Sequence, residues 1–180
     1  FIVDLSNGNY HLIEKKVVIE GQKTAYFSEK FLEITVPVTT KEQIKEIKKT
    51  VTHIAKKHDE EPYKALATTQ QAIFHQIEEQ DEIDAAAIFD KVFEEKPLAR
   101  EAAQLAITEE RVPEKIAVTN VPKYERKYSK QKFKLDNGIE ITIPSEIYEN
   151  KEMVEFINNP DGSVSVLIKN IESILNKFNA

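Results

Sequence analysis

The residues with the clearest chemical potential in this chain are cations that gather just before an Asn-Gly pair. From Thr119 to Lys134 the sequence has six basic residues and one acidic residue, a local net charge of +5 in a chain whose formal net charge is −6. The six are Lys123, Arg126, Lys127, Lys130, Lys132 and Lys134. Because ammonium and guanidinium groups neutralise phosphates and release condensed counterions, these six are candidate DNA-binding residues.

Aromatic residues are interspersed with these cations, and they allow two interpretations. Tyr124, Tyr128 and Phe133 would add stacking on exposed bases if they face outward. Alternatively, the rings face the core, and the lysines solvate a connector or pair with acidic helices elsewhere. Contact with about five phosphates would make log K fall with log salt at a slope of roughly −4 to −5. Lys outnumbers Arg by 22 to 3, which favours contacts to phosphates over the reading of guanine edges.

Residues that could perform catalysis form no recognisable pattern. The chain has no cysteine, which excludes disulfides, thiolate metal sites and cysteine nucleophiles. His53 and His58 are five residues apart, whereas the two histidines of a helical zinc motif are four apart. The four glycines look like turn residues rather than parts of a phosphate loop. The sequence therefore predicts no catalytic residues, no metal and no cofactor.

Length and composition are those of a globular protein. A length of 180 residues with 41% hydrophobic residues suffices for one domain or two small ones. No run approaches the roughly 18 apolar residues of a membrane span, and no export signal is recognisable at the start. We therefore expect a cytoplasmic protein with no membrane partner. Because the chain opens on Phe1 rather than Met, we interpret it as a fragment of a longer protein.

The pattern of apolar residues predicts an α+β fold in three parts. Residues 1–40 read as a short β meander, which we interpret as the tail of a missing N-terminal domain, with strands at Phe1–Leu5, Tyr10–Ile19 and Thr24–Phe27. Residues 41–115 read as a helical module of about four helices, and residues 116–180 as a C-terminal α+β unit.

Local signals predict where the four helices begin. Their expected first residues are Thr40 with a capping box, Pro62, Asp84 as a cap, and Pro97. In the fourth helix, Leu98, Ala102 and Leu105 are expected to face inward. The outward lysines of the first helix are interpreted as ordinary solvation, and they include Lys45, Lys48 and Lys49.

The C-terminal unit contains two hairpin signals. Asn137-Gly138 lies between alternating apolar and polar residues, which predicts a hairpin with a type I′ turn. A second hairpin is expected around the turn at 158–162, and a short helix near 145–150. The two hairpins together predict a small, four-stranded, largely antiparallel β-sheet. Asn170 is expected to cap a terminal helix with one apolar face, formed by Ile171, Ile174, Leu175 and Phe178.

These segments resemble a known family. The carboxyl-terminal runs 133–146 and 154–170, together with Tyr10-His-Leu-Ile-Glu-Lys15, Gly21-Gln-Lys23 and Tyr26-Phe27, are similar to the bacterial nucleoid-associated protein family of the NdpA type. The resemblance covers the family's middle and C-terminal portion. It implies a cytoplasmic, non-enzymatic protein located with bacterial chromosomal DNA, and it carries no catalytic residue over to this chain.

Two functional hypotheses follow from these observations. The first is a nucleoid-associated, DNA-binding protein that contacts backbone phosphates with little sequence specificity. The second is an adaptor that reaches the nucleoid through another nucleoid protein, because residues 59–114 have a net charge of −10 and would repel DNA. A hydrolase or nuclease would need a cluster of carboxylates or histidines that the chain order hides. A homodimer is a further open alternative.

Overall fold

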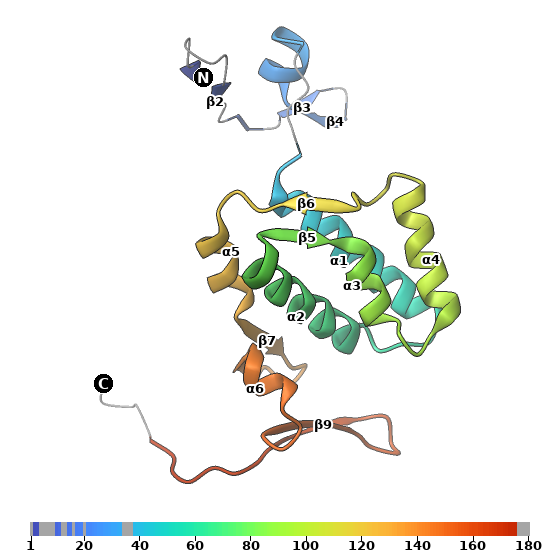
Figure 1. Cartoon of the computed structure of the whole chain (residues 1–180), viewed down its shortest axis with the longest axis vertical. Coiled ribbons are helices and arrows are strands. Elements are labelled where there is room, and N and C mark those ends of the chain that lie inside the picture. Colours follow the sequence, from blue (N-terminus) through green and yellow to red (C-terminus); the bar gives the residue numbers. More distant parts are fainter. Residues whose placement is uncertain are drawn as a thin grey trace. The chain divides into compact units, whose positions relative to one another are not determined.

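The computed structural model describes residues 2–3, 10–11, 14–15, 17–19, 21–33 and 38–175 (Figure 1). The chain forms two compact units, Phe1–Thr39 and Thr40–Ala180. Within the described residues, every helix is too short or too polar to cross a lipid bilayer.

The first unit consists of short antiparallel strand pairs followed by one helix. Its elements are β1 (Ile2–Val3), β2 (Tyr10–His11), β3 (Val17–Ile19), β4 (Gln22–Thr24) and the π-helix η1 (Tyr26–Phe31). Strand β1 pairs with β2, and β3 pairs with β4. The predicted strand over Thr24–Phe27 is therefore wrong beyond its first residue, because η1 begins at Tyr26.

The carboxylate of Glu14 explains why a helix begins at this point. It accepts hydrogen bonds from the backbone N–H of Phe27, from the backbone N–H of Ser28 at 3.1 Å, and from the Ser28 hydroxyl at 2.7 Å. Such bonds satisfy donors that a helix start leaves without partners. Desolvation acts to raise the pKa of Glu14, but the hydrogen bonds from Ser28 and Phe27 outweigh it and lower the pKa.

The second unit begins with the predicted helical module. Its helices are α1 (Thr40–Lys57), α2 (Pro62–Gln80), α3 (Ala85–Val92) and α4 (Pro97–Thr108). Asp84 caps α3 as predicted, since its carboxylate accepts the N–H of Ala87 at 2.9 Å. Thr40 is part of α1 rather than its cap, and its hydroxyl donates to the carbonyl of Ala117 at 3.2 Å.

The helices enclose the core of the unit. Helix α1 contributes Ile44, Ile47 and Val51, which are at most 2% exposed. Helices α2 and α3 add further buried apolar residues, which are Ile73, Phe74, Ile77, Ile88 and Phe89. Removing these side chains from water is the main contribution that holds α1 to α4 together.

Helix α4 packs with a different face from the predicted one. Leu98 is 72% exposed and Leu105 is 50% exposed, whereas Ala99, Ala103 and Ala106 are buried. The prediction that the two leucines face inward is wrong. Small alanines let the α4 backbone approach its neighbours closely, and the leucines are left on the outside.

A short strand pair closes the helical module. Strand β5 (Glu82–Asp84) pairs antiparallel with β6 (Lys115–Ala117), so Ile83 lies opposite Ile116. Both isoleucines are at most 1% exposed. The pairing with β5 was not predicted, because Glu82–Asp84 is too short to show an alternating pattern.

The rest of the second unit consists of short helices and two β-hairpins. The elements are α5 (Val121–Tyr128), β7 (Lys130–Lys134), β8 (Glu140–Pro144), α6 (Ser145–Glu149), β9 (Val154–Asn158) and β10 (Val164–Ile168). The α+β fold class and both hairpins are confirmed. The four-stranded sheet is not formed, because the hairpins remain two separate two-stranded sheets.

The first hairpin turns with a longer loop than predicted. The N–H of Leu135 donates to Ile139 O at 2.8 Å, and the N–H of Gly138 donates to Leu135 O at 3.1 Å. Gly138 has a φ of 88°, and Asn137 has no positive φ. A type I′ turn needs positive φ at both central residues. The loop is therefore the three-residue form, in which a left-handed glycine follows a tight turn.

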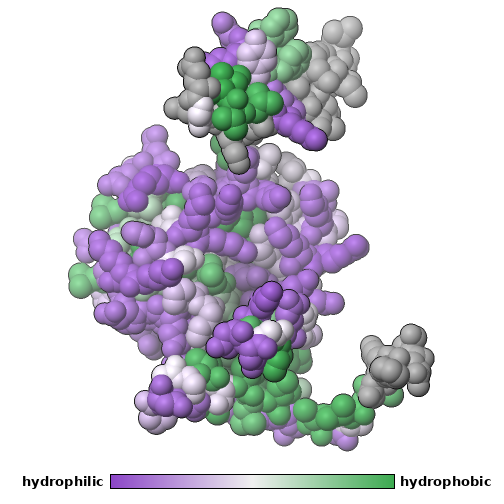
Figure 2. Space-filling view, turned by 180° about the vertical axis from the view of Figure 1, so that it is seen from behind, coloured by the Kyte–Doolittle hydropathy of each residue, from purple (hydrophilic) through white to green (hydrophobic). Residues whose placement is uncertain are grey.

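Apolar side chains near the C-terminal end of the described chain are exposed to solvent. Residues 169–175 have no regular secondary structure, so the predicted terminal helix is absent there, and Phe178 lies outside the described residues. Ile171, Ile174 and Leu175 are 53%, 86% and 81% exposed. Together with exposed Leu167 and Ile168 of β10, they form the apolar surface at the C-terminal end of the molecule in Figure 2. Formation of a homodimer stays an open alternative.

Candidate nucleic-acid interface

Helix α5 carries the first half of the predicted cationic segment. Its start is capped by Asn120, whose side-chain oxygen accepts the N–H of Lys123 at 3.3 Å. Tyr124 and Tyr128, one helical turn apart, are 8% and 2% exposed, and their rings stack with centroids 6.4 Å apart. For these two rings the core-facing interpretation holds. They anchor α5, and base stacking on them is not available.

Ammonium groups gather around the two stacked tyrosines. The Nζ of Lys127 lies 5.8 Å from the ring centroid of Tyr124 and 5.1 Å from that of Tyr128. The Nζ of Lys123 lies 5.8 Å from the Tyr124 centroid, and that of Lys48 on α1 lies 5.0 Å from the Tyr128 centroid. The negative faces of aromatic rings attract such cations. The tyrosines therefore hold lysines of two helices close together.

Burial and neighbouring ammonium groups lower the pKa values of Lys48 and Lys127. Burial lowers the pKa of Lys48, and the charge of Lys127 lowers it further. Burial likewise lowers the pKa of Lys127, with added repulsion from Lys41 and Lys123. We call Lys41, Lys48, Lys123 and Lys127 the lysine cluster.

Carboxylates do not neutralise the centre of this cluster. Within the described part of the chain, Lys48, Lys123 and Lys127 form no ion pair, whereas Lys49 on the same helix pairs with Glu46 at 2.7 Å. Like charges held together without counter-ions are a favourable place for an anion, because a bound phosphate relieves their repulsion. The cluster is thus a candidate binding site for a polyanion.

Strand β7 carries the second half of the segment. Lys130, Lys132 and Lys134 are all exposed and alternate with Gln131 and Phe133, so the three lysines share one face of the strand. The buried amide of Gln131 donates to Ala67 O at 2.9 Å and fixes β7 to α2. Lys134 lies 4.0 Å from Glu140, but both side chains are more than 70% exposed, so this pair contributes little.

Four of the six predicted residues thus fall into two groups. Lys123 and Lys127 belong to the lysine cluster, and Lys132 and Lys134 lie with Lys48 around one pocket. Arg126 and Lys130 are exposed, and neither forms an ion pair within the described residues. Neither of these two residues belongs to the lysine cluster.

Helix α1 supplies lysines that sequence reasoning assigned to solvation. Lys41 and Lys48 are seven residues apart, which is two helical turns, so they lie on the same side of α1. The sequence shows this spacing, but it does not show that α5, some 80 residues later, lies beside it. The available signal was that no carboxylate lies three or four residues before or after Lys48, whereas Glu46 lies three residues before Lys49 and pairs with it.

The imidazole of His75 contacts two carboxylates. The Nε2 atom of His75 lies 2.7 Å from Glu149 Oε1, and its Nδ1 atom lies 3.8 Å from Glu78. This side chain joins α2 to α6. Among the described residues, no group of three or more histidines and carboxylates is arranged to hold a metal ion.

Comparison with known proteins adds a family to this geometry. The family model described as nucleoid-associated protein YejK matches residues 2–176. The chain belongs to this family. The resemblance seen in the hairpin sequences is thereby confirmed. No curated protein and no solved structure gives a significant match.

Membership of the nucleoid-associated protein family supports a role at the nucleoid. The family description names no ligand and no reaction. The family description therefore assigns no contact residues in this chain.

Proposed function

We propose that this member of the nucleoid-associated family binds DNA directly through backbone phosphates. The observation that carries the proposal is the lysine cluster, in which Lys48, Lys123 and Lys127 surround two stacked tyrosines without a carboxylate partner. The cations of β7 extend this surface. We include Arg126 and Lys130 in the proposed contact set because they are exposed on the same two elements.

The chemistry of these groups suits a binder with little sequence preference. Lysine presents a compact point charge, whereas arginine presents the fork that reads guanine edges. Phosphate contacts position a protein on DNA without reading its sequence. We propose no catalytic step, no cofactor and no metal, and we place the protein in the cytoplasm with the chromosomal DNA.

A titration of the full chain against duplex DNA tests this function. A duplex of about 30 base pairs with arbitrary sequence is labelled and followed by fluorescence anisotropy at low salt. Binding at micromolar concentrations, with similar affinity for unrelated sequences, supports the proposal. No change in anisotropy at low salt contradicts it.

The lowered pKa of Lys48 predicts how DNA binding depends on pH. As pH rises from about 7 to about 10, Lys48 loses its proton before an ordinary lysine does, so the affinity for duplex DNA falls. Lys48→Arg keeps the charge over this range and should remove part of the fall, while Lys56→Arg, on the same helix, should leave it unchanged. Identical pH profiles for Lys48→Arg and the unchanged chain would show that Lys48 is not at the interface.

The adaptor hypothesis is favoured by a different surface. Leu98 and Leu105 are exposed and seven residues apart on α4, and the acidic residues around them are exposed as well. These are Glu94, Glu95, Glu101 and Glu109. Exposed apolar side chains rimmed by charge are typical of protein-docking sites. This surface fits a basic partner protein better than it fits DNA.

A pull-down from nuclease-treated lysate separates the two functions. Direct DNA binding predicts that no specific protein remains with the chain once DNA is removed. A specific protein that is retained by the unchanged chain and lost with Leu98→Ser/Leu105→Ser would favour the adaptor. A matched control is Leu167→Ser, which changes an exposed leucine on another element.

A further inference from the structure

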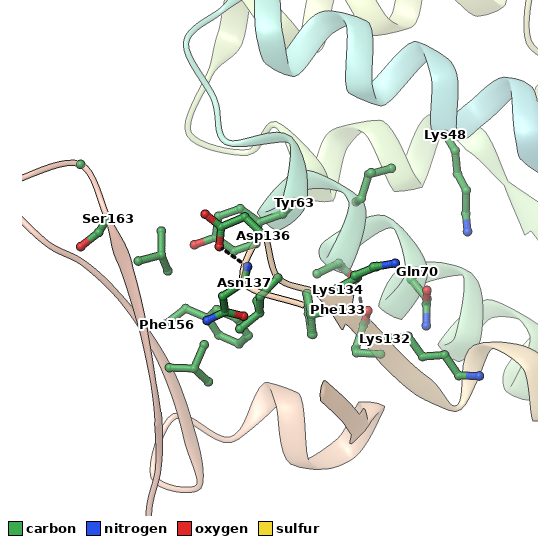
Figure 3. Close-up of a pocket in the computed structure, with 17 residues that line it drawn as sticks. Lys48, Tyr63, Gln70, Lys132, Phe133, Lys134, Asp136, Asn137, Phe156 and Ser163 are labelled. Atoms are coloured by element: carbon green, nitrogen blue, oxygen red, sulfur yellow. Dashed lines mark hydrogen bonds between the residues drawn. The ribbon is translucent and has the colours of Figure 1, made fainter. Parts of the chain in front are cut away.

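A pocket of about 700 Å³ lies between α2 and the two C-terminal hairpins (Figure 3). Helix α2 forms one wall, β7 with its loop forms the second, and the β9–β10 hairpin forms the third. Its volume is within the range of small-molecule sites in proteins. The lysine cluster touches this pocket at one residue only, which is Lys48.

One end of the pocket is cationic. Lys48 comes from α1, and Lys132 and Lys134 come from β7, so three lysines of two distant segments line the same space. In Figure 3, Lys48, Gln70 and Lys132 lie together on one side of the pocket. The Gln70 amide donates to Lys130 O at 2.6 Å, so β7 and α2 are tied together at this end.

The other end is aromatic. The ring of Phe156 on β9 lies 5.0 Å from that of Phe133 and 5.8 Å from that of Tyr63, measured between centroids. All three side chains line the pocket and are only half-buried. Burial raises the pKa of Tyr63, and the nearby Glu61 carboxylate raises it further.

A ligand that joins an anion to a flat ring uses both ends. A bare phosphate would contact the lysines and leave the rings in water, and an apolar ligand would leave the ammonium groups without a counter-ion. A nucleotide joins an anion to a flat ring within one small unit, and flat bases stack on aromatic side chains. The bases of an intact duplex are stacked and paired, so they cannot enter.

We propose that this pocket binds one nucleotide with an unpaired base, its phosphate at Lys48 and Lys132 and its base beside Phe133 and Phe156. The source is either a free nucleotide or an unpaired position in a DNA strand. The second source rests on the DNA binding proposed above, because the strand would continue from the lysine cluster through Lys48. Binding of a free nucleotide does not depend on the proposed DNA binding.

Three probes of the full chain test the pocket. The first is a labelled single-stranded thymidine oligomer of about 15 nucleotides, and the second is an oligomer of equal length and charge in which every nucleotide lacks its base. We expect the base-containing strand to bind at least about 5-fold more tightly, because stacking of one base contributes that much. Equal affinities for the two strands overturn the proposal for DNA strands.

Two variants locate the effect. Phe156→Leu removes one ring and should bring the ratio of the two affinities close to one, with folding checked by thermal melting. Lys132→Gln should weaken both strands equally and leave the ratio unchanged. If Phe156→Leu does not fold, the ratio of the two affinities measured for the unchanged chain still tests the proposal. A ratio that survives in a folded Phe156→Leu protein places the base elsewhere and overturns the proposal.

The third probe is thymidine monophosphate alone, which separates the two sources. Displacement of the single strand at millimolar concentration shows that a free nucleotide is sufficient. A base-dependent ratio without displacement assigns the pocket to strands only. Duplex binding with neither a ratio nor displacement rejects the pocket and leaves the proposed function standing. Absence of all DNA binding rejects the proposed function. Calorimetry with thymidine monophosphate then tests the pocket separately: binding supports the proposal, and no binding overturns it.

Discussion

Replacement of Lys48, Lys123 and Lys127 together by glutamine is expected to weaken duplex DNA binding about 100-fold or more at ~0.1 M salt. Each phosphate contact releases close to one counterion, so each lost contact lowers the affinity by somewhat less than tenfold at this salt concentration. The three lysines lie around one pair of tyrosine rings, so one bound strand can meet all of them. Anisotropy titration measures the change.

A control with the same loss of charge distinguishes a site from a general effect of net charge. Lys56→Gln/Lys57→Gln/Lys91→Gln also removes three exposed lysines, two of them at the far end of α1. This variant should bind duplex DNA within about 3-fold of the unchanged chain, because long-range charge is screened beyond about 10 Å. Equal losses in the two triple variants would mean that the lysine cluster is not a distinct interface.

Phe89→Ala is expected to lower the free energy of unfolding of the second unit by about 3–5 kcal/mol. The ring lies on α3 with 0% exposure, in the core that joins α1 to α4. Its removal loses the burial of an aromatic side chain and leaves a cavity that fixed helices cannot fill. Chemical denaturation followed by circular dichroism measures the change.

Leu98→Ala is the matched comparison. It also shortens a large apolar side chain, but Leu98 is 72% exposed on α4, so the change should stay within about 0.5 kcal/mol. The inward helical face read from the sequence instead places Leu98 in the core and predicts a loss comparable to that of Phe89. If Leu98→Ala lowered the free energy of unfolding as much as Phe89→Ala does, Leu98 would face the core as predicted from the sequence, and the structure of α4 would be contradicted.

Local signals in the sequence predicted most of the elements correctly. Pro62 and Pro97 begin helices and Asp84 caps one, because these residues satisfy or remove backbone donors that a helix start leaves without partners. Both hairpins formed where a glycine ends a loop between alternating strands. Such signals act over a few residues, so a single sequence reveals them.

Features that depend on distant segments were missed. The inward face of α4 is set by how closely neighbouring helices approach, and small Ala99 suits that approach better than Leu98 does. Asn170 offers a helix cap, but Ile171, Ile174 and Leu175 stay exposed rather than packed, and a short isolated helix is marginal in water.

The candidate interface illustrates the same limit. The positive charge between Lys123 and Lys134 is visible in the sequence, and so are the tyrosines within it. Lys48 became part of the interface only through its position over the Tyr128 ring, which joins residues 80 positions apart. A charge cluster formed by two distant segments can be recognised only when the fold that brings the segments together is known.

The most direct test of the account is the slope of log K against log salt for duplex DNA, measured for the unchanged chain and for the triple glutamine variant of Lys48, Lys123 and Lys127. The account predicts a slope of roughly −4 to −5 for the unchanged chain and roughly −1.5 to −2 for the variant, because three phosphate contacts are removed. Identical slopes for the two proteins, whatever their affinities, would show that these lysines do not contact phosphate and would contradict the account.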